Sequence, residues 1–178
     1  LADWLGVPVQ TASALRYTDV QRYVREVGRD AVRHIVAWGG GRSFAEYGIH
    51  PVELVVSCLG AEAIGVMRRG DDQFWQLLIN FRSGRTAVVN LCLGTNTAYA
   101  AAVTTTTETK LITVDAGRLF LDTLAGILDF FEAGRPLIDR AETLMIRQIL
   151  DVAQEARASE GFIPLEVIRW ANENGVWP

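Results

Sequence analysis

The sequence predicts an α+β fold: an open, mostly antiparallel sheet with helices packed on one face. Within residues 61–115, apolar stretches alternate with short turn sequences such as Gly-Asp-Asp and Ser-Gly-Arg, which predicts four or five consecutive strands. Two helical patterns follow, and strands followed by helices are typical of α+β domains. Because connections this short cannot make parallel crossovers, we expect the strands to form an antiparallel meander.

The chain is predicted to begin with the end of a helix and an extended stretch. Gly6 suits the C-cap of that helix, and residues 7–9 then begin the extended stretch. A helix end at residue 1 indicates a preceding part of the protein. In residues 18–27, apolar side chains recur at the spacing of one helix face, so we expect an amphipathic helix that Gly28 ends.

A strand, a loop and a helix are expected next. Residues 31–38 are predicted as a strand, and the three glycines 39–41 as a loop whose backbone can approach a ligand closely. A helix follows from about Phe44. Because proline is tolerated in the first turn of a helix and not in its interior, Pro51 places the main helix at about residues 50–59.

Two helices are predicted after the strands. The first has one apolar face and is closed by Gly134. Its apolar face comprises Leu121, Leu124, Leu128 and Phe131. The second covers residues 140–159, with Asp139 as N-cap and Glu142 in the place of a capping-box acid. A short helix is predicted around residues 165–172.

Composition excludes several classes of protein. The 178 residues, 49% hydrophobic and 21% charged, have the balance of a soluble globular domain. A net charge of -4 opposes binding to nucleic acid. No apolar run approaches the length of about 20 residues that spans a bilayer, and no secretion signal is present, so we expect no membrane partner and a cytoplasmic location. Cys58 and Cys92 lie in apolar runs without a cysteine and histidine cluster, which predicts buried thiols and no metal.

The motif that indicates a function lies in residues 39–60, GGGRSFAEYGIHPVELVVSCLG. This run resembles the second-domain signature of the glucose-fructose oxidoreductase / inositol dehydrogenase / MocA family, which has a glycine pair and then Asp-x-Gly-x-His-x-x-Asp. His50 matches the histidine and Glu46 matches the first acid. Glutamate replaces the usual aspartate there and moves the carboxylate by about one bond length. Residues 7–17 and 134–161 also resemble the corresponding parts of that family.

The resemblance implies a domain organisation. Residues 11–178 would be a substrate-binding and oligomerisation domain of the dihydrodipicolinate-reductase-like type, and residues 1–10 the remnant of the last helix and strand of a missing Rossmann domain. That domain would bind NAD or NADP in the full-length parent. Since this sequence has neither Gly-x-Gly-x-x-Gly nor the family's Glu-Lys-Pro, we expect no cofactor site here and no turnover by this chain alone. The strands are apolar on both faces, so the open sheet face is expected to form a homo-oligomer.

The resemblance also implies that His50 and Glu46 form the catalytic pair beside the nicotinamide. Histidine suits the removal of a hydroxyl proton because its pKa lies near neutrality, and a neighbouring carboxylate can orient it and raise its pKa. The four-residue spacing would place both side chains on one helix face. The alternative is that His50 merely caps the helix that starts near Pro51.

Four further residues are candidates for substrate binding. Arg16 could reach the cofactor or the substrate, or could pair with a carboxylate at the start of the following helix. Tyr17, Trp38 and Tyr47 could offer ring faces on which a sugar stacks, or could belong to the core.

The function that these expectations support is the substrate-binding half of an NAD(P)-dependent oxidoreductase. It would transfer hydride between a nicotinamide and a small-molecule sugar, polyol or related hydroxy compound. The alternative is a non-catalytic binding or scaffold domain that keeps the fold and lacks the chemistry. Neither Gly-x-Ser-x-Gly, a P-loop nor HExxH is present to support another class of enzyme.

Overall fold

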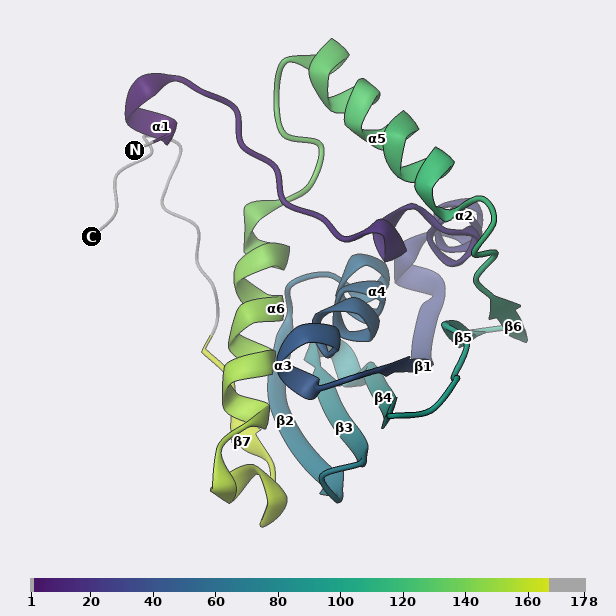
Figure 1. Cartoon of the computed structure of the whole chain (residues 1–178), viewed down its shortest axis with the longest axis vertical. Coiled ribbons are helices and arrows are strands. Elements are labelled where there is room, and N and C mark those ends of the chain that lie inside the picture. Colours follow the sequence, from purple (N-terminus) through teal and green to yellow (C-terminus); the bar gives the residue numbers. More distant parts are fainter. Residues whose placement is uncertain (1, 167–178) are drawn as a thin grey trace.

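The computed structural model describes residues 2–166, within which seven strands form one sheet (Figure 1). The strands are β1 Val32–Gly41, β2 Ala63–Gly70, β3 Phe74–Phe81, β4 Thr86–Leu93, β5 Ala100–Thr105, β6 Thr109–Thr113 and β7 Ile163–Pro164. Their order in the sheet is β6-β5-β1-β4-β3-β2-β7. β1 and β4 are parallel, and the other neighbouring pairs are antiparallel. The predicted α+β fold with an open, mostly antiparallel sheet is confirmed.

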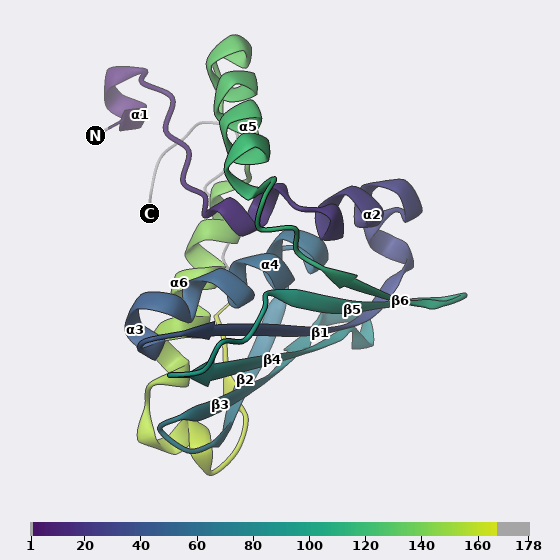
Figure 2. The same cartoon turned by 45° about the vertical axis from the view of Figure 1, so that its right-hand side comes forward.

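Helices cover one face of this sheet, as predicted (Figure 2). The α-helices are α1 Ala2–Leu5, α2 Asp19–Val27, α3 Phe44–Tyr47, α4 Ile49–Leu59, α5 Leu119–Ala133 and α6 Arg140–Ala153. Short 3-10 helices are η1 Ala14–Tyr17, η2 Arg29–Ala31, η3 Arg82–Gly84 and η4 Ala156–Ser159. The last helix therefore ends earlier than predicted, and η4 follows it. Most of the short helix predicted around residues 165–172 lies outside the described residues.

The predicted meander is correct for β2, β3 and β4 and for the β5–β6 pair, and it is wrong only between β4 and β5. β1, which precedes them in the chain, lies between β4 and β5 and pairs with both. Residues 94–99 therefore cross over β1. Two strand spacings amount to about 10 Å, which six residues cover easily. Central placement suits β1 because Ile35 and Ala37 are fully buried under the helices.

The glycines 39–41 do not form the predicted loop. They continue β1 and pair with residues 91–93 of β4. Two tyrosine rings explain why glycine is needed there: a Cβ at Gly39 would lie 2.6 Å from Cε1 of Tyr99, and one at Gly41 would lie 2.2 Å from Cγ of Tyr47. These glycines therefore admit aromatic rings close to the strand.

α4 is the central helix of the core. Pro51 lies in its first turn, as predicted, and every residue from Pro51 to Leu59 is buried. A helix buried on all sides packs against several neighbours, and α4 contacts β1, β4, α2, α6 and η1. Burying one valine or leucine side chain fully stabilises the folded state by about 1.5–3 kcal/mol relative to leaving it in water. Because α4 is held from all sides, its first turn is a rigid support for a site.

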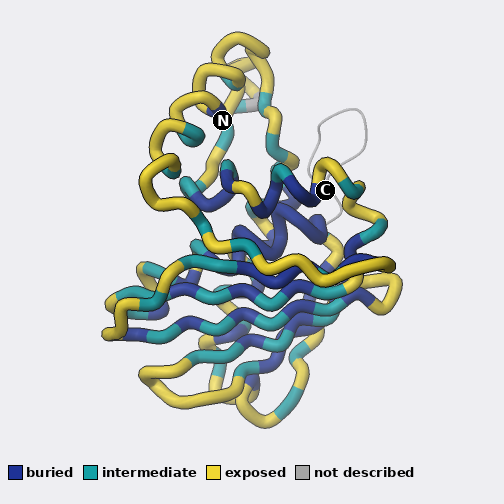
Figure 3. Tube along the Cα trace, turned by 90° about the vertical axis from the view of Figure 1, so that its right-hand side faces the viewer, coloured by how far each residue is buried: buried dark blue, intermediate teal, exposed yellow. Residues whose placement is uncertain are grey.

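α5 packs differently from the other long helices. It lies on the side of the helical layer away from the sheet, and most of its length is exposed (Figures 2 and 3). Gly126 is its one buried residue, within the described part of the chain. The predicted apolar face is present and uncovered: Leu121 is 68% exposed and Phe131 is 69% exposed. Exposed apolar patches of this kind mark interaction surfaces.

The N-terminal segment lies at the same end of the molecule as α5 (Figure 2). α1 ends at Gly6, which has the positive φ of a helix C-cap, as predicted. Residues 7–13 form neither helix nor strand. Trp4 is 83% exposed and Leu5 is 55% exposed. This segment therefore adds apolar surface to the end formed by α5. Among residues 2–166, none of the helices has the length and apolarity to cross a membrane.

Candidate functional site

His50 lies in the first turn of α4, directly after the break between α3 and α4 at Gly48. Its half-buried imidazole lies between two tyrosines, with ring centroids 5.9 Å from Tyr47 and 5.9 Å from Tyr99, both in edge-on orientation. Among the described residues, no protein group hydrogen-bonds to either ring nitrogen. Both nitrogens are therefore free to exchange a proton with a ligand.

The environment of His50 keeps its imidazole neutral. Burial lowers the pKa of His50 below its ordinary value, and the negative charge of Glu53, one turn later in α4, opposes this shift. At neutral pH the ring is then mostly in its unprotonated form. That form can act as a general base.

Glu46 is exposed on α3 and does not interact directly with His50 in the structure. Its carboxylate accepts a hydrogen bond from Ser43 Oγ at 3.3 Å, and its backbone N–H donates to the same hydroxyl at 3.3 Å. Glu46 and His50 lie on two helices, not on the one helix face expected from their spacing. The expectation that Glu46 raises the pKa of His50 is wrong, because burial dominates and the opposing charge belongs to Glu53.

Short-range packing fixes the position of α3 and hence of Tyr47. Phe44 stacks on Trp75 of β3, with ring centroids 4.1 Å apart. Ser43 caps the helix N-terminus by accepting a hydrogen bond from the Glu46 backbone. Of the predicted substrate-binding residues, Tyr47 is thus the one that the structure brings to His50.

Tyr99 was not among the residues singled out from the sequence. It precedes β5, and its hydroxyl donates a hydrogen bond to the Gly40 carbonyl at 3.1 Å. The chain separation of 49 positions from His50 leaves no local signal of this contact. Only the placement of β5 beside β1 brings Tyr99 to the site.

Arg16 is buried in an ion-pair cluster. Its Nε lies 3.0 Å from Glu53 of α4, and its Nη1 lies 2.5 Å from Glu142 of α6. Arg29 pairs with the same Glu142 at 3.0 Å, and the Ser13 backbone N–H donates to Glu53. Of the two alternatives for Arg16, pairing with a carboxylate is observed, but the partners lie on α4 and α6 and not at the start of α2. Arg16 instead ties η1 to the two helices that lie on the sheet.

Glu53 was also missed in the sequence. It occupies the last acidic place of the family pattern His-x-x-Asp, so the motif did carry a signal for it. Glu142 was assigned to a capping box, but its carboxylate binds the two arginines. Because a buried charge is stable only when it is paired, the charges of Glu53 and Glu142 depend on the arginines that neutralise them.

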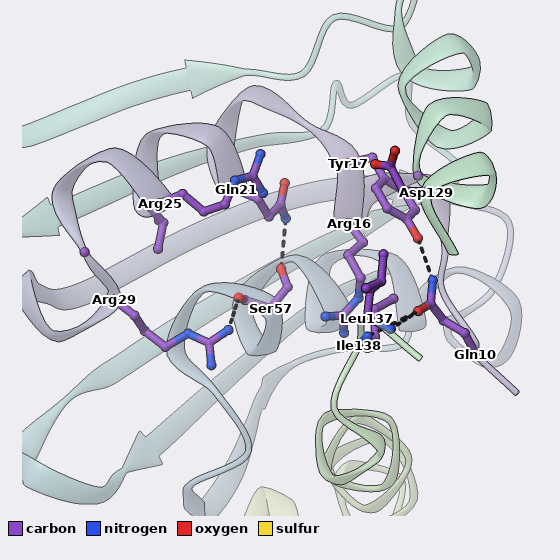
Figure 4. Close-up of a pocket in the computed structure, with 13 residues that line it drawn as sticks. Gln10, Arg16, Tyr17, Gln21, Arg25, Arg29, Ser57, Asp129, Leu137 and Ile138 are labelled. Carbon is purple, nitrogen blue, oxygen red and sulfur yellow. Dashed lines mark hydrogen bonds between the residues drawn. The ribbon is translucent and has the colours of Figure 1, made fainter. Parts of the chain in front are cut away.

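Arg16 and Tyr17 line a cavity of about 360 Å³ that does not include His50 (Figure 4). Tyr17 accepts a hydrogen bond from Gln10 Nε2 at 3.3 Å. Its ring fits against Gly126 of α5, where a Cβ would lie 2.1 Å from Tyr17 Cε1. Tyr17 therefore joins η1 to α5 rather than joining Tyr47 at the histidine.

Trp38 lies on the other face of the sheet. Side chains alternate along a strand, and its neighbours Ala37 and Gly39 face the helices. Trp38 is half-buried and pairs in register with Asn90 of β4 and Ala100 of β5. The predicted substrate-binding residues thus occupy three separate places.

The cysteines offer no reactive group at this site. Burial raises the pKa of Cys58 to about 12, so its thiol is protonated at neutral pH. Cys92 is half-buried on β4. Across residues 2–166, no cluster of three or more histidine, cysteine, aspartate or glutamate side chains could hold a metal ion.

Solved structures match this fold, whereas no family model and no curated protein matches the sequence. GenD2 from gentamicin A biosynthesis, in complex with NAD, superposes with a TM-score of 0.73 at 14% identity, over 93% of this chain and 66% of that one. A probable dehydrogenase from Thermotoga maritima gives 0.76 at 11% identity, over 91% and 66%. Scyllo-inositol dehydrogenase from Lactobacillus casei, with bound NAD(H) and scyllo-inositol, gives 0.70 at 10% identity, over 92% and 66%.

The chain shares their fold. Because the identities are this low, the similarity concerns the fold alone. The chain spans 66% of the length of each of these structures, slightly less than two thirds.

Proposed function

We propose that this chain is the substrate-binding and oligomerisation domain of an NAD- or NADP-dependent oxidoreductase of the glucose-fructose oxidoreductase / inositol dehydrogenase / MocA family. Its substrate would be a sugar, polyol or related hydroxy compound. The observation that carries the proposal is His50: it occupies the histidine position of the family motif, on a rigid helix end, with both ring nitrogens unpaired. The fold that it shares with NAD-bound GenD2 and with NAD(H)-bound scyllo-inositol dehydrogenase supports the proposal.

The chemistry assigned to His50 is proton transfer. In oxidation of a secondary alcohol, the imidazole takes the hydroxyl proton while the carbon loses hydride and becomes a carbonyl. A nicotinamide held by another domain would supply the hydride acceptor. The lowered pKa of His50 keeps the base unprotonated at neutral pH. In the reverse direction the imidazolium returns the proton to the forming alkoxide.

The neighbouring residues are assigned lesser roles. Glu46 and Tyr47 lie on α3, one turn before His50, and we assign them to hydrogen bonding and ring contact with the hydroxylated substrate. Arg16 supports α4 through Glu53 rather than contacting substrate. The single departure at position 46, Glu in place of Asp, lengthens the reach of that carboxylate toward the substrate by one methylene group.

A nucleotide-binding domain would pack against the apolar end formed by α5 and the N-terminal segment. Exposed apolar side chains line that end, and they are Trp4, Leu5, Val7, Val9, Phe120, Leu121, Leu124, Leu128 and Phe131. About one third of each similar structure lies outside the part that this chain covers, and a nucleotide-binding domain would account for it. Residues 1–10 would then be the end of that domain, and the chain alone would hold no cofactor.

The proposal is tested on the full-length protein that contains this chain. We expect it to bind NAD or NADP and to oxidise at least one member of a panel of inositols and sugars, as followed by nicotinamide absorbance. The 178-residue chain should show neither binding by calorimetry nor turnover. Hydrogen exchange at α5 should be slower in the longer protein, because the apolar end is covered. A longer protein without a nucleotide-binding domain, or without dinucleotide binding, would contradict the proposal.

The open face of the sheet is proposed as the surface that joins subunits. Val36, Trp38, Leu78 and Val88 alternate with helix-facing residues on β1, β3 and β4, and all four are half-buried. Val36, Val88 and Leu78 are neighbours across the strands, so these side chains form a contiguous apolar patch, and such patches mark interaction surfaces. We therefore expect the chain to be a dimer or tetramer in sedimentation velocity.

A charge at the centre of this face should dissociate the oligomer. Leu78→Glu places a carboxylate opposite Val88 and Met67, where association would bury it unpaired. Leu144→Glu, on an exposed part of α6, is the matched control and should leave the assembly unchanged. A monomeric wild-type chain, or a Leu78→Glu variant that associates normally, would rule out this surface.

A further inference from the structure

We propose that Tyr99 is a positioning residue for His50, and that Tyr99 and Tyr47 together clamp the imidazole. The effect of this clamp on catalysis rests on the proposed function, whereas the clamp itself is a property of this chain. The inference concerns a residue that lies in no recognised part of the motif.

The first argument is the geometry of the rings. The imidazole makes an interplanar angle of 71° with Tyr47 and 82° with Tyr99, at centroid distances of 5.9 Å in both cases. Edge-to-face contacts in this range are directional and favourable. In the described part of the chain no hydrogen bond orients either nitrogen of His50, so these two contacts define how the ring is held.

The second argument is that the backbone is shaped for these rings. Gly39 and Gly41 lie two positions apart on β1, so both face the helices, and their missing side chains leave room for Tyr99 and Tyr47 respectively. Between them, the Gly40 carbonyl accepts the hydrogen bond from the Tyr99 hydroxyl. Gly39 and Gly41 thus leave space for one tyrosine ring each, and Gly40 supplies the carbonyl that binds the Tyr99 hydroxyl.

The third argument concerns charge. The ionisable groups that act on or contact His50 are Glu53 on α4, Tyr47 on α3 and Tyr99 before β5, whereas Glu46 on α3 bonds to Ser43 instead. Burial, and then the neighbouring Tyr47, raise the pKa of Tyr99, so its phenol stays neutral at physiological pH. Tyr99 therefore acts on His50 by excluding water and by ring contact, not by a charge.

The clamp can be measured in the 178-residue chain by NMR titration of the histidine Cε1–H signals. Only His34 and His50 contribute, and a His34→Gln variant assigns them. His34, on β1, is an internal reference because it lies away from the clamp, with its Nδ1 2.8 Å from Oγ1 of Thr86 on β4. Tyr99→Leu should raise the pKa of His50 toward about 6.5 and remove the ring-current shift of its signal. Tyr99→Phe keeps the ring and should leave both close to wild type.

A second variant provides an independent test in case Tyr99→Leu does not fold. Gly39→Ala introduces a Cβ that displaces the Tyr99 ring, and it should move the His50 signal in the same direction. If the His50 pKa and shift are unchanged in folded Tyr99→Leu and Gly39→Ala, the clamp does not exist. The readout needs neither cofactor nor substrate, so it is independent of whether the longer protein is a dehydrogenase.

In the longer protein, the same variants extend the test to turnover. A base must be unprotonated, so a raised His50 pKa moves the acid limb of the kcat/KM profile to higher pH. Tyr99→Leu should show this displacement and a lower kcat, and Tyr99→Phe should restore both. An unmoved pH profile in Tyr99→Leu would remove the positioning role, even where the NMR clamp holds.

Discussion

Replacing His50 with alanine in the full-length protein should lower turnover by about 10²-fold or more, the usual contribution of a general acid or base. The reason is that His50 has two unpaired nitrogens and a pKa lowered by burial, so that it is ready to accept a proton at neutral pH. The measurement is steady-state kinetics with the best substrate of the panel. Because the group must be unprotonated, wild-type kcat/KM should fall as pH drops through the His50 pKa, and this limb should be absent in the variant.

The matched control is His34→Ala, which removes the other histidine from the opposite face of the sheet. It should leave turnover per active site within a few fold of wild type. Dinucleotide affinity should be unchanged in His50→Ala, since the cofactor would be bound elsewhere. A His50→Ala variant with normal turnover would remove the base role and favour the non-catalytic alternative.

Replacing Arg16 with alanine should lower the free energy of unfolding by about 3–5 kcal/mol, the cost of breaking a buried ion pair by removing one partner. Arg16, Glu53 and Glu142 have side-chain exposures of 8%, 4% and 6%, so the substitution leaves Glu53 buried without its cation. Glu142 keeps Arg29. Urea unfolding of the 178-residue chain, followed by circular dichroism, measures the change.

Arg147→Ala is the comparison for this experiment. Arg147 pairs with Asp151 on the surface of α6 with 75% of its side chain exposed, and such pairs contribute little. Comparing the two variants therefore separates the stability lost with a buried ion pair from the stability lost with any arginine side chain. If Arg16→Ala were as stable as Arg147→Ala, the cluster would not be the link that holds η1 to α4 and α6.

Much of the fold was predictable because the signals are local. The helix of residues 18–27, the start of α4 at Pro51 and the hairpins of β2, β3 and β4 follow from periodicity, proline and turn residues. Each of these signals acts within about ten residues. The resemblance to the family motif likewise identified His50 as a candidate, and His50 lies in the first turn of α4, where it was expected.

The glycine run shows how a local signal can mislead. Three consecutive glycines favour a loop, but residues 39–41 continue β1 because Tyr47 and Tyr99 pack against them. The requirement comes from rings that lie 6 and 60 positions away in the chain, from Gly41 and Gly39 respectively. Propensity at one site cannot report such contacts, and tertiary packing overrides it.

By itself, the sequence determined the α+β class, the boundaries of most elements and the histidine that is the candidate base. The tertiary structure decided that β1 lies between β4 and β5, that Glu53 rather than Glu46 acts on His50, that Tyr99 completes its surroundings, and that α5 leaves its apolar face uncovered. The physical reason is the separation along the chain of the residues that interact. Periodicity and capping depend on neighbouring residues, whereas strand order, burial and electrostatic partners depend on groups that only folding brings together.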